Sequence, residues 1–375
     1  MIKRELKSML TSRMYTSKAL IVLGPRQTGK TTLLTEISEK EGVFLFLNCD
    51  DPHIRASLEN ISTTALQQLI GNNKLVFIDE AQRVKNIGIS LKLITDQFKD
   101  VQLLVSGSSA LELANEINEP LTGRKFEYIL YPISYQELLN HTNYIKAIQQ
   151  LEQRMIFGMY PEIINNPGNE VELLKQISDS YLYKDLLSYK GIRKPDILRK
   201  LLVALSLQVG SEVSYNELSI ILQVDKSTIS SYIDLLEKAF VIFKLQPLSR
   251  NSRNEISKSK KIYFYDNGIR NILINNTNRL EYRNDTGALW ENFLISERMK
   301  FNQYNLHYCN NYFWRTHQQK EIDYIEEYDG KLFAYKFKWK AKKSPKLPAD
   351  FYKNYKNTSF SIITKDNFLE FLQNK

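Results

Sequence analysis

An eight-residue pattern directly after a short apolar run limits the possible folds of this chain more than any other part of the sequence. Residues 24–31 read GPRQTGKT and match G-x-x-x-x-G-K-[ST] at every fixed position. The preceding run, Ala19–Leu23, is continuously apolar, which is typical of a strand buried on both faces. Glycines let the loop curl, and a helix is expected to begin near Lys30. The pattern therefore predicts a strand, a phosphate-binding loop and a helix, in that order.

This loop has the chemistry that phosphate groups require. Its backbone N–H groups would point at phosphate oxygens, and the helix would direct the positive end of its dipole to the same place. Lys30 would neutralise the β- and γ-phosphates of a nucleotide, and Thr31 would place its hydroxyl on Mg²⁺. The residues predicted to bind the nucleotide are Gly24, Pro25, Arg26, Gln27, Thr28, Gly29, Lys30, Thr31 and Thr32.

Further apolar runs alternate with helical patterns along the first part of the chain. The runs at 43–47, 75–78 and 101–105 are short, and Ile87–Phe98 is one of the amphipathic stretches between them. Alternation of this kind predicts an α/β fold with a parallel sheet and helices on its faces. We assign residues 1–150 to this P-loop domain.

The run at 75–78 ends in two acids. An Asp that closes a strand of a P-loop sheet, here Asp79, suits the second position that organises Mg²⁺, beside Thr31. Glu80 follows at once and can polarise an attacking water as a general base. The pair favours nucleotide hydrolysis over nucleotide storage. Acidic residues also occur at the ends of strands simply because these positions are solvated.

Two more polar positions are candidates for the reaction. Residues 106–109 read SGSS, and Ser108 could contact the γ-phosphate or the water, although this is also ordinary turn chemistry. Arg124 could stabilise transition-state charge, either within its own chain or from a neighbouring subunit of a homo-oligomer. An arginine in a surface loop is common, so both assignments remain open.

Longer strings resemble one family. The chain reads GPRQTGKTTLL, NCDDPHIR, FIDEAQRV, VSGSSALEL and LTGRKFEYILYPISYQEL in that order, with GMYPE at 158–162. These strings resemble the AAA+-like prokaryotic ATPases that carry a C-terminal domain of unknown function, built from a winged helix and a restriction-nuclease-like fold. The resemblance covers nearly the whole chain. It implies ATP binding and hydrolysis, with ATP rather than GTP as the nucleotide.

The middle of the chain, residues 151–275, is predicted to form a helical lid and a winged helix-turn-helix. Residues 214–222 have capping-box spacing, and 226–239 carry apolar residues at three- and four-residue steps. Strands at 241–245 and 261–265 would flank a basic loop, which completes the winged order. The second helix and this loop could bind double-stranded DNA, or these two elements could contact only protein. The residues concerned are Lys226, Ser227, Thr228, Ser230, Ser231, Arg250, Arg253, Lys258, Lys260 and Lys261.

The last part, residues 276–375, is expected from the resemblance to be a restriction-nuclease-like α/β domain. Such nucleases hold Mg²⁺ between a helix Glu, a strand-end Asp and an [ED]-x-Lys on the next strand. Glu291 and Asp323 supply the first two, but Lys336 stands two residues before Lys338, where the acid belongs. A lysine cannot ligate Mg²⁺, so the domain is predicted to be inactive, and an ATP-driven DNA nuclease is the less favoured alternative.

The segment around Lys336 is strongly basic and rich in aromatic residues. Residues 331–346 contain seven lysines and no acid. This segment could bind nucleic acid without cutting it, or the aromatic side chains could face the core by alternation while the lysines face solvent. The aromatic residues are Phe333, Tyr335, Phe337 and Trp339.

Composition adds weaker constraints. Lys and Arg number 51 against 42 Asp and Glu, a formal net charge of +9 that favours a polyanionic partner. Cys49 and Cys309 cannot form a disulfide framework, which fits a reducing cytoplasm, and no secretory signal, membrane span or zinc spacing is found. Asp266 and Arg270 are expected to form a turn and an ion pair. A nucleotide-ordered switch that does not hydrolyse ATP remains an alternative.

Overall fold

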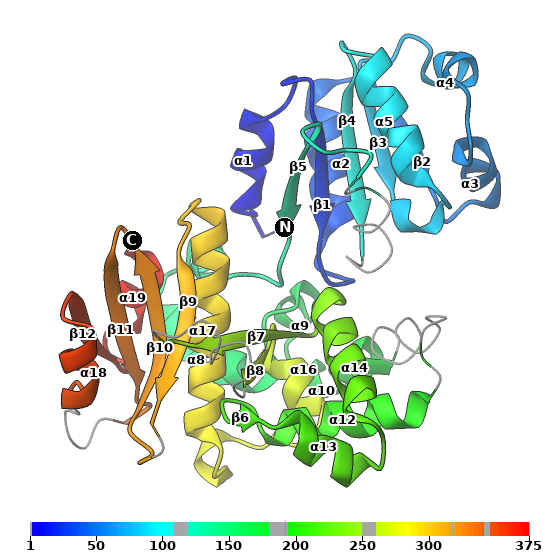
Figure 1. The fold of residues 1–375 in the computed structure, drawn as a ribbon. Coiled ribbons are helices and arrows are strands. Elements are labelled where there is room, and N and C mark those ends of the chain that lie inside the picture. Colours follow the sequence, from blue (N-terminus) through cyan, green and yellow to red (C-terminus); the bar gives the residue numbers. More distant parts are fainter. Residues whose placement is uncertain are drawn as a thin grey trace. The chain divides into compact units, whose positions relative to one another are not determined.

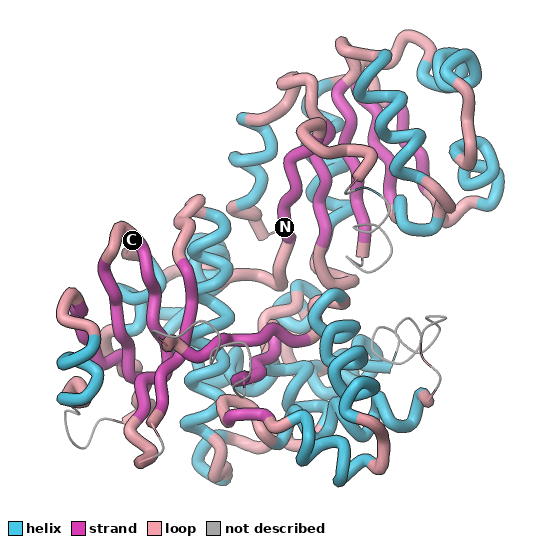
Figure 2. Tube along the Cα trace, viewed as in Figure 1, coloured by secondary structure: helices cyan, strands magenta, loops and turns pink. Residues whose placement is uncertain are grey.

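Each of the two units of the chain is built around one β-sheet (Figures 1 and 2). The computed structural model describes residues 2–108, 117, 119–179, 192, 194–249, 260–316, 318–340 and 346–374. The first unit runs to Ile133 and takes in Lys238–Phe240, and the second comprises Ser134–Glu237 and Val241–Lys375. The finer division into three parts, at residues 150 and 275, stays a prediction.

A five-stranded parallel sheet forms the centre of the first unit, in the order β2-β3-β4-β1-β5 (Figure 1). The strands are β1 Ala19–Leu23, β2 Leu45–Asn48, β3 Leu75–Asp79, β4 Gln102–Gly107 and β5 Lys125–Ile129. The helices are α1 Leu6–Ser12, α2 Lys30–Glu41, α3 Pro52–Leu58, α4 Thr63–Ile70, η1 Ala81–Arg83 and α5 Ile87–Gln97. This confirms the predicted α/β fold. Strands β1, β3 and β4 are buried along their whole length, as their apolar runs predicted.

The two edge strands differ from the sequence-based expectation. The apolar run at 43–47 gives a shorter strand, because β2 begins at Leu45, and Phe46 is 44% exposed on this edge strand. Strand β5 was not predicted, because its residues KFEYI alternate between charged and aromatic and form no continuous apolar run.

A seven-stranded mixed sheet runs through the second unit, in the order β12-β11-β10-β9-β7-β8-β6 (Figure 1). The strands are β6 Glu212–Val213, β7 Ile242–Pro247, β8 Lys260–Phe264, β9 Asn310–Arg315, β10 Glu321–Tyr328, β11 Lys331–Phe337 and β12 Thr358–Ile363. A short parallel pairing of β7 with β9 joins strands from the two sides of residue 275. Strands β10 and β11 form a hairpin, and Asp329 and Gly330 at its turn both have positive φ, as a type I′ turn requires.

Helices pack around this second sheet. They are α7 Tyr135–His141, α8 Tyr144–Phe157, α9 Pro161–Asn165, α10 Glu170–Ile177, α12 Pro195–Leu207, α13 Tyr215–Leu222, α14 Lys226–Lys238, α16 Asn267–Leu273, η3 Leu280–Tyr282, α17 Thr286–Tyr304, α18 Ala349–Asn354 and α19 Phe368–Gln373. The Ser214 hydroxyl accepts from the N–H of Glu217 and caps α13, as predicted. Helices α13 and α14 and strands β7 and β8 lie within two residues of their predicted places. Arg250, Arg253 and Lys258, from the predicted basic loop, lie outside the described residues.

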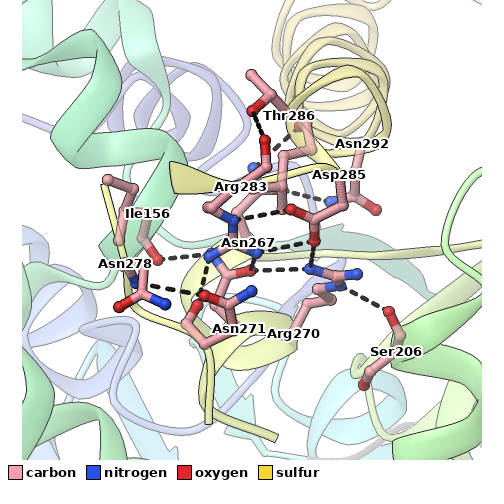
Figure 3. A network of polar contacts seen from close by, with 12 residues as sticks. Ile156, Ser206, Asn267, Arg270, Asn271, Asn278, Arg283, Asp285, Thr286 and Asn292 are labelled. Carbon is pink, nitrogen blue, oxygen red and sulfur yellow. Dashed lines mark hydrogen bonds and ion pairs between the residues drawn. The ribbon is translucent and has the colours of Figure 1, made fainter. Parts of the chain in front are cut away.

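A buried polar network holds α16 against its neighbours (Figure 3). Asp266 caps α16 by accepting from the N–H of Ile269, and it also accepts from the N–H of Met159 at 2.7 Å. Arg270 pairs with Asp285, so the expected structural roles of Asp266 and Arg270 are confirmed. Burial would raise the pKa of Asp285, but hydrogen bonds from the two arginines Arg283 and Arg270 lower that pKa to about 2.

Candidate nucleotide-binding site

The carboxyl ends of three neighbouring strands meet at one edge of the parallel sheet. Strand β1 leads into the loop 24–29, β3 ends at Asp79, and β4 ends at Gly107, beside Leu23. In open parallel sheets, ligands bind at this edge. The loop 24–29 and both predicted acids, Asp79 and Glu80, therefore lie at the same edge of the sheet.

The loop is held in a curled shape by its backbone. A Cβ on Gly24 would lie 2.3 Å from the Leu130 carbonyl oxygen, so only glycine fits there. Gln27 and Gly29 have positive φ, and Gly29 is the N-cap of α2. The Thr28 hydroxyl closes the curl by donating to the Pro25 carbonyl at 2.9 Å.

Lys30 is buried beneath this loop. Its Nζ donates to the carbonyl oxygens of Gly24 at 3.0 Å and Pro25 at 2.8 Å. Burial lowers the pKa of Lys30 to about 8, although the charges of Glu80 and Asp79 oppose this. Across the described part of the chain, no carboxylate forms an ion pair with this ammonium. A desolvated cation with only carbonyl partners is suited to an anionic ligand.

Hydroxyl groups from two elements hold the Asp79 carboxylate. The Thr31 hydroxyl donates to it at 2.9 Å, and the Ser106 hydroxyl donates to its other oxygen. Burial raises the pKa of Asp79 above its ordinary value, while both hydroxyls lower it. The structure thus brings together Thr31 and Asp79, the two predicted magnesium ligands.

Glu80 follows with a left-handed backbone at φ 52°. Its N–H donates to the Ser106 hydroxyl at 3.2 Å, and its carboxylate accepts from Gln82 Nε2. The same Nε2 donates to the Ser108 hydroxyl at 2.8 Å. Ser108 therefore lies near the predicted base, whereas Ser106 contacts both acids. Gln82 was not among the predicted site residues, although its place two residues after Glu80 was a usable signal.

Arg4 fastens the loop from outside the motif. Its guanidinium donates to the Thr28 and Tyr131 carbonyl oxygens, both at 2.6 Å, and the side chain is buried. No sequence pattern pointed to this residue. Gln27 and Thr32 are exposed and Arg26 is half-buried, and their roles in ligand binding stay predictions.

Arg124 lies at the opposite edge of the sheet. Its carbonyl accepts from the N–H of Ala19, at the first residue of β1, whereas the loop begins after Leu23. The strand separates the two by about 13 Å at 3.3 Å per residue. Its side chain pairs with Asp96 at 2.6 Å. In this structure Arg124 therefore lies away from the loop of its own chain, and its role, within its own chain or at a neighbouring subunit's site, stays a prediction.

A second group of charged residues lies in the C-terminal sheet. Lys261 is fully buried and pairs with Glu291 at 3.0 Å and with Glu321. The Tyr263 hydroxyl also donates to Glu291, at 2.6 Å. Lys261 was predicted to belong to an exposed basic loop, and this was wrong because its ammonium is enclosed by carboxylates. We call Lys261, Glu291, Glu321, Asp323 and Lys336 the lysine–carboxylate cluster.

Lys336 fills the other side of the cluster. Its ammonium pairs with Asp323, which also accepts from the N–H of Phe337 at 2.7 Å. Burial alone would lower the pKa of Lys261, but Glu291, Glu321 and Asp323 raise it above its ordinary value. Two ammonium groups thus pair with three carboxylates in the cluster. The loss of metal binding and nuclease activity stays a prediction.

The aromatic residues near Lys336 pack inside the second unit. Tyr335 and Phe337 contact Phe371 of α19, with ring centroids 4.7 and 5.5 Å apart, and Trp339 contacts Trp290 of α17 at 5.2 Å. Of the two alternatives, the core assignment is confirmed for Phe337, which is buried, whereas Tyr335 and Trp339 are half-buried.

Comparison with known proteins places these features in context. Residues 16–139 match the family model described as "AAA domain", 148–280 match "Domain of unknown function (DUF8612)", and 286–374 match "Domain of unknown function (DUF4143)". Within the described ranges, no helix has the length and apolar character needed to cross a bilayer.

Relatives extend over most of the chain. An uncharacterized protein of Methanocaldococcus jannaschii is 26% identical over 84% of this chain and 73% of its own length. An uncharacterized protein of Mycobacterium tuberculosis is 26% identical over 90% of this chain and 74% of its own length. The solved Walker-type ATPase of Pyrococcus abyssi aligns with 73% of this chain and 96% of its own, at 15% identity and a TM-score of 0.49.

Proposed function

Because the chain joins an AAA domain at residues 16–139 to a DUF4143 domain at 286–374, we propose that it binds ATP with Mg²⁺ and hydrolyses it. One observation carries the proposal. Thr31, Asp79 and Glu80 lie together at the carboxyl edge of the sheet, beside the buried ammonium of Lys30. This is the arrangement that phosphoryl transfer to water needs.

The oxygen atoms of Thr31 and Asp79 fit a magnesium ion. The Thr31 hydroxyl lies 2.9 and 3.1 Å from the two carboxylate oxygens of Asp79, and Mg²⁺ prefers oxygen ligands. When bound, the ion neutralises charge on the β- and γ-phosphates. Thr31 and Asp79 would hold it, and Ser106 would keep the Asp79 carboxylate oriented.

Glu80 would act as the general base. The water oxygen bonds to the γ-phosphorus while the bond from that phosphorus to the bridging oxygen breaks, and the electron pair leaves with ADP. The Glu80 carboxylate takes one proton from the water. Lys30 would exchange its carbonyl partners for phosphate oxygens and balance their charge.

ATP turnover by the purified full chain tests this proposal. Lys30→Ala should lose nucleotide binding, whereas Glu80→Gln should keep binding and lose turnover by about 100-fold or more. Glu39→Gln, an exposed glutamate on α2, is the matched control and should behave like the wild type. Wild-type protein that binds ATP without turnover would overturn hydrolysis and favour the nucleotide-ordered switch.

A second candidate function is DNA contact through a winged helix formed by α13, α14, β7 and β8. The observation that favours it is the exposed face of α14, where Lys226, Ser227 and Ser231 point away from the core. Hydroxyls and an ammonium on one helix face suit phosphate contacts. Duplex DNA should then bind in a salt-dependent manner and raise ATP turnover, and Ser231→Glu should abolish both effects. Equal binding by this variant would exclude α14 as the contact.

A further inference from the structure

Gln82 bridges two predicted reaction residues in the first unit. Its Nε2 donates to the Glu80 carboxylate and, at 2.8 Å, to the Ser108 hydroxyl. Gln82 lies in η1, whose first turn is closed by a hydrogen bond from the Arg83 N–H to the Glu80 carbonyl at 3.0 Å. This turn folds the Gln82 side chain back toward Glu80.

The orientation of the Gln82 amide follows from its neighbours. The Glu80 carboxylate accepts hydrogen bonds only, so the NH₂ group of Gln82 has to face it. The amide oxygen Oε1 therefore points elsewhere. It is buried, and among the residues that the structure describes no group donates a hydrogen bond to it. Buried polar atoms normally have partners, so this acceptor suits a donor that the ligand-bound site would bring.

We propose that Gln82 is a positioning residue for the attacking water. Its Nε2 holds the Glu80 carboxylate in place, and its Oε1 accepts a hydrogen bond from the water O–H whose proton Glu80 does not remove. Two fixed acceptors orient the water oxygen toward the γ-phosphorus, and orientation of this kind contributes to the rate without changing nucleotide affinity. The inference rests on the proposed hydrolysis of ATP.

Gln82→Ala and Gln82→Glu test this inference in the full chain. Alanine removes both interactions, whereas glutamate keeps an acceptor, loses the donor and places a second carboxylate beside Glu80. Both variants should lower kcat by about 10- to 100-fold, with KM and the Kd for ATP within about threefold of the wild type. Gln68→Ala, an exposed glutamine on α4, is the matched control.

A transition-state mimic separates positioning from a purely structural effect. ADP with aluminium fluoride should bind wild-type protein more tightly than ADP alone, and Gln82→Ala should lose most of this gain while keeping its affinity for ADP. Equal losses for both ligands, with a lowered melting temperature in both variants, would overturn the inference. So would unchanged kcat in both. Absence of turnover in the wild type would instead overturn the proposed hydrolysis, and this inference with it.

Discussion

Two buried lysines show how differently the two units treat a cation. Lys30 in the first unit donates to the carbonyls of Gly24 and Pro25, and burial lowers its pKa to about 8. Lys261 in the second unit is enclosed by carboxylates, which overcome burial and raise its pKa. The ammonium of Lys30 is suited to bind an anionic ligand, whereas the ammonium of Lys261 is already paired with carboxylates of the protein.

The partners of a buried lysine distinguish one that can bind a ligand from one that stabilises the fold. Burying an ammonium group costs free energy, and carbonyl oxygens offset this cost only in part. A bound phosphate would therefore stabilise the buried charge of Lys30. Paired carboxylates offset that cost within the protein, so Lys261 gains little further stabilisation from an anionic ligand. Variants of the two lysines should therefore affect different measurements.

The largest effect is expected for Lys261→Met. Removal of the ammonium leaves the half-buried carboxylates Glu291 and Glu321 without their shared partner, which should reduce the free energy of unfolding by about 3–5 kcal/mol. Thermal or urea unfolding of the purified protein measures this loss. A change below about 1 kcal/mol would remove the basis of the comparison.

Lys30→Met should act in the opposite sense on stability. The unliganded protein loses a buried charge with no carboxylate partner in the described residues, so its stability should stay constant or rise by about 1 kcal/mol. Affinity for ATP should fall by about 100-fold, because charge-assisted hydrogen bonds to phosphate are lost. Calorimetric titration and thermal melting are the two measurements. A strong loss of unliganded stability would show that Lys30 is structural.

The pH dependence of nucleotide affinity should follow Lys30. Phosphate binds the charged ammonium, so ATP affinity should fall as pH rises through about 8, by up to about tenfold per pH unit. Between this pKa and the higher pKa of the unfolded chain, only the unfolded state keeps the proton. Stability of the unliganded protein should therefore increase with pH in that window. Lys30→Met should show neither trend.

The smallest expected effect concerns Lys336→Glu. This change replaces the ammonium beside Asp323 with a carboxylate and gives the lysine–carboxylate cluster a possible divalent-cation site. The variant should melt at a lower temperature in EDTA and recover by a few degrees in Mn²⁺, worth about 1 kcal/mol. Lys338→Glu, at an exposed position, is the control and should not respond to Mn²⁺. No response in Lys336→Glu would show that Lys261 alone keeps cations out.

Local patterns predicted the first unit well because its apolar runs and its loop are contiguous in the sequence. Strands β1, β3 and β4 and the loop needed no knowledge of distant residues. The distance of Arg124 from the loop could not be predicted, because it depends on strand direction, which a local motif does not encode. Lys261 was misjudged because its partners Glu291 and Glu321 lie 30 and 60 residues further along the chain.

The lysine–carboxylate cluster also determines which truncated fragments of this chain can be expected to fold. Lys261 comes from β8, whereas its acids come from α17 and β10, and β7 extends the same sheet beside β9. A fragment that starts at residue 276 would keep the acids, lose the ammonium and expose one side of β9. The segment matched by the DUF4143 family is therefore not expected to fold when expressed alone. Truncations that start near Ser134, where the second unit begins, keep the cluster intact.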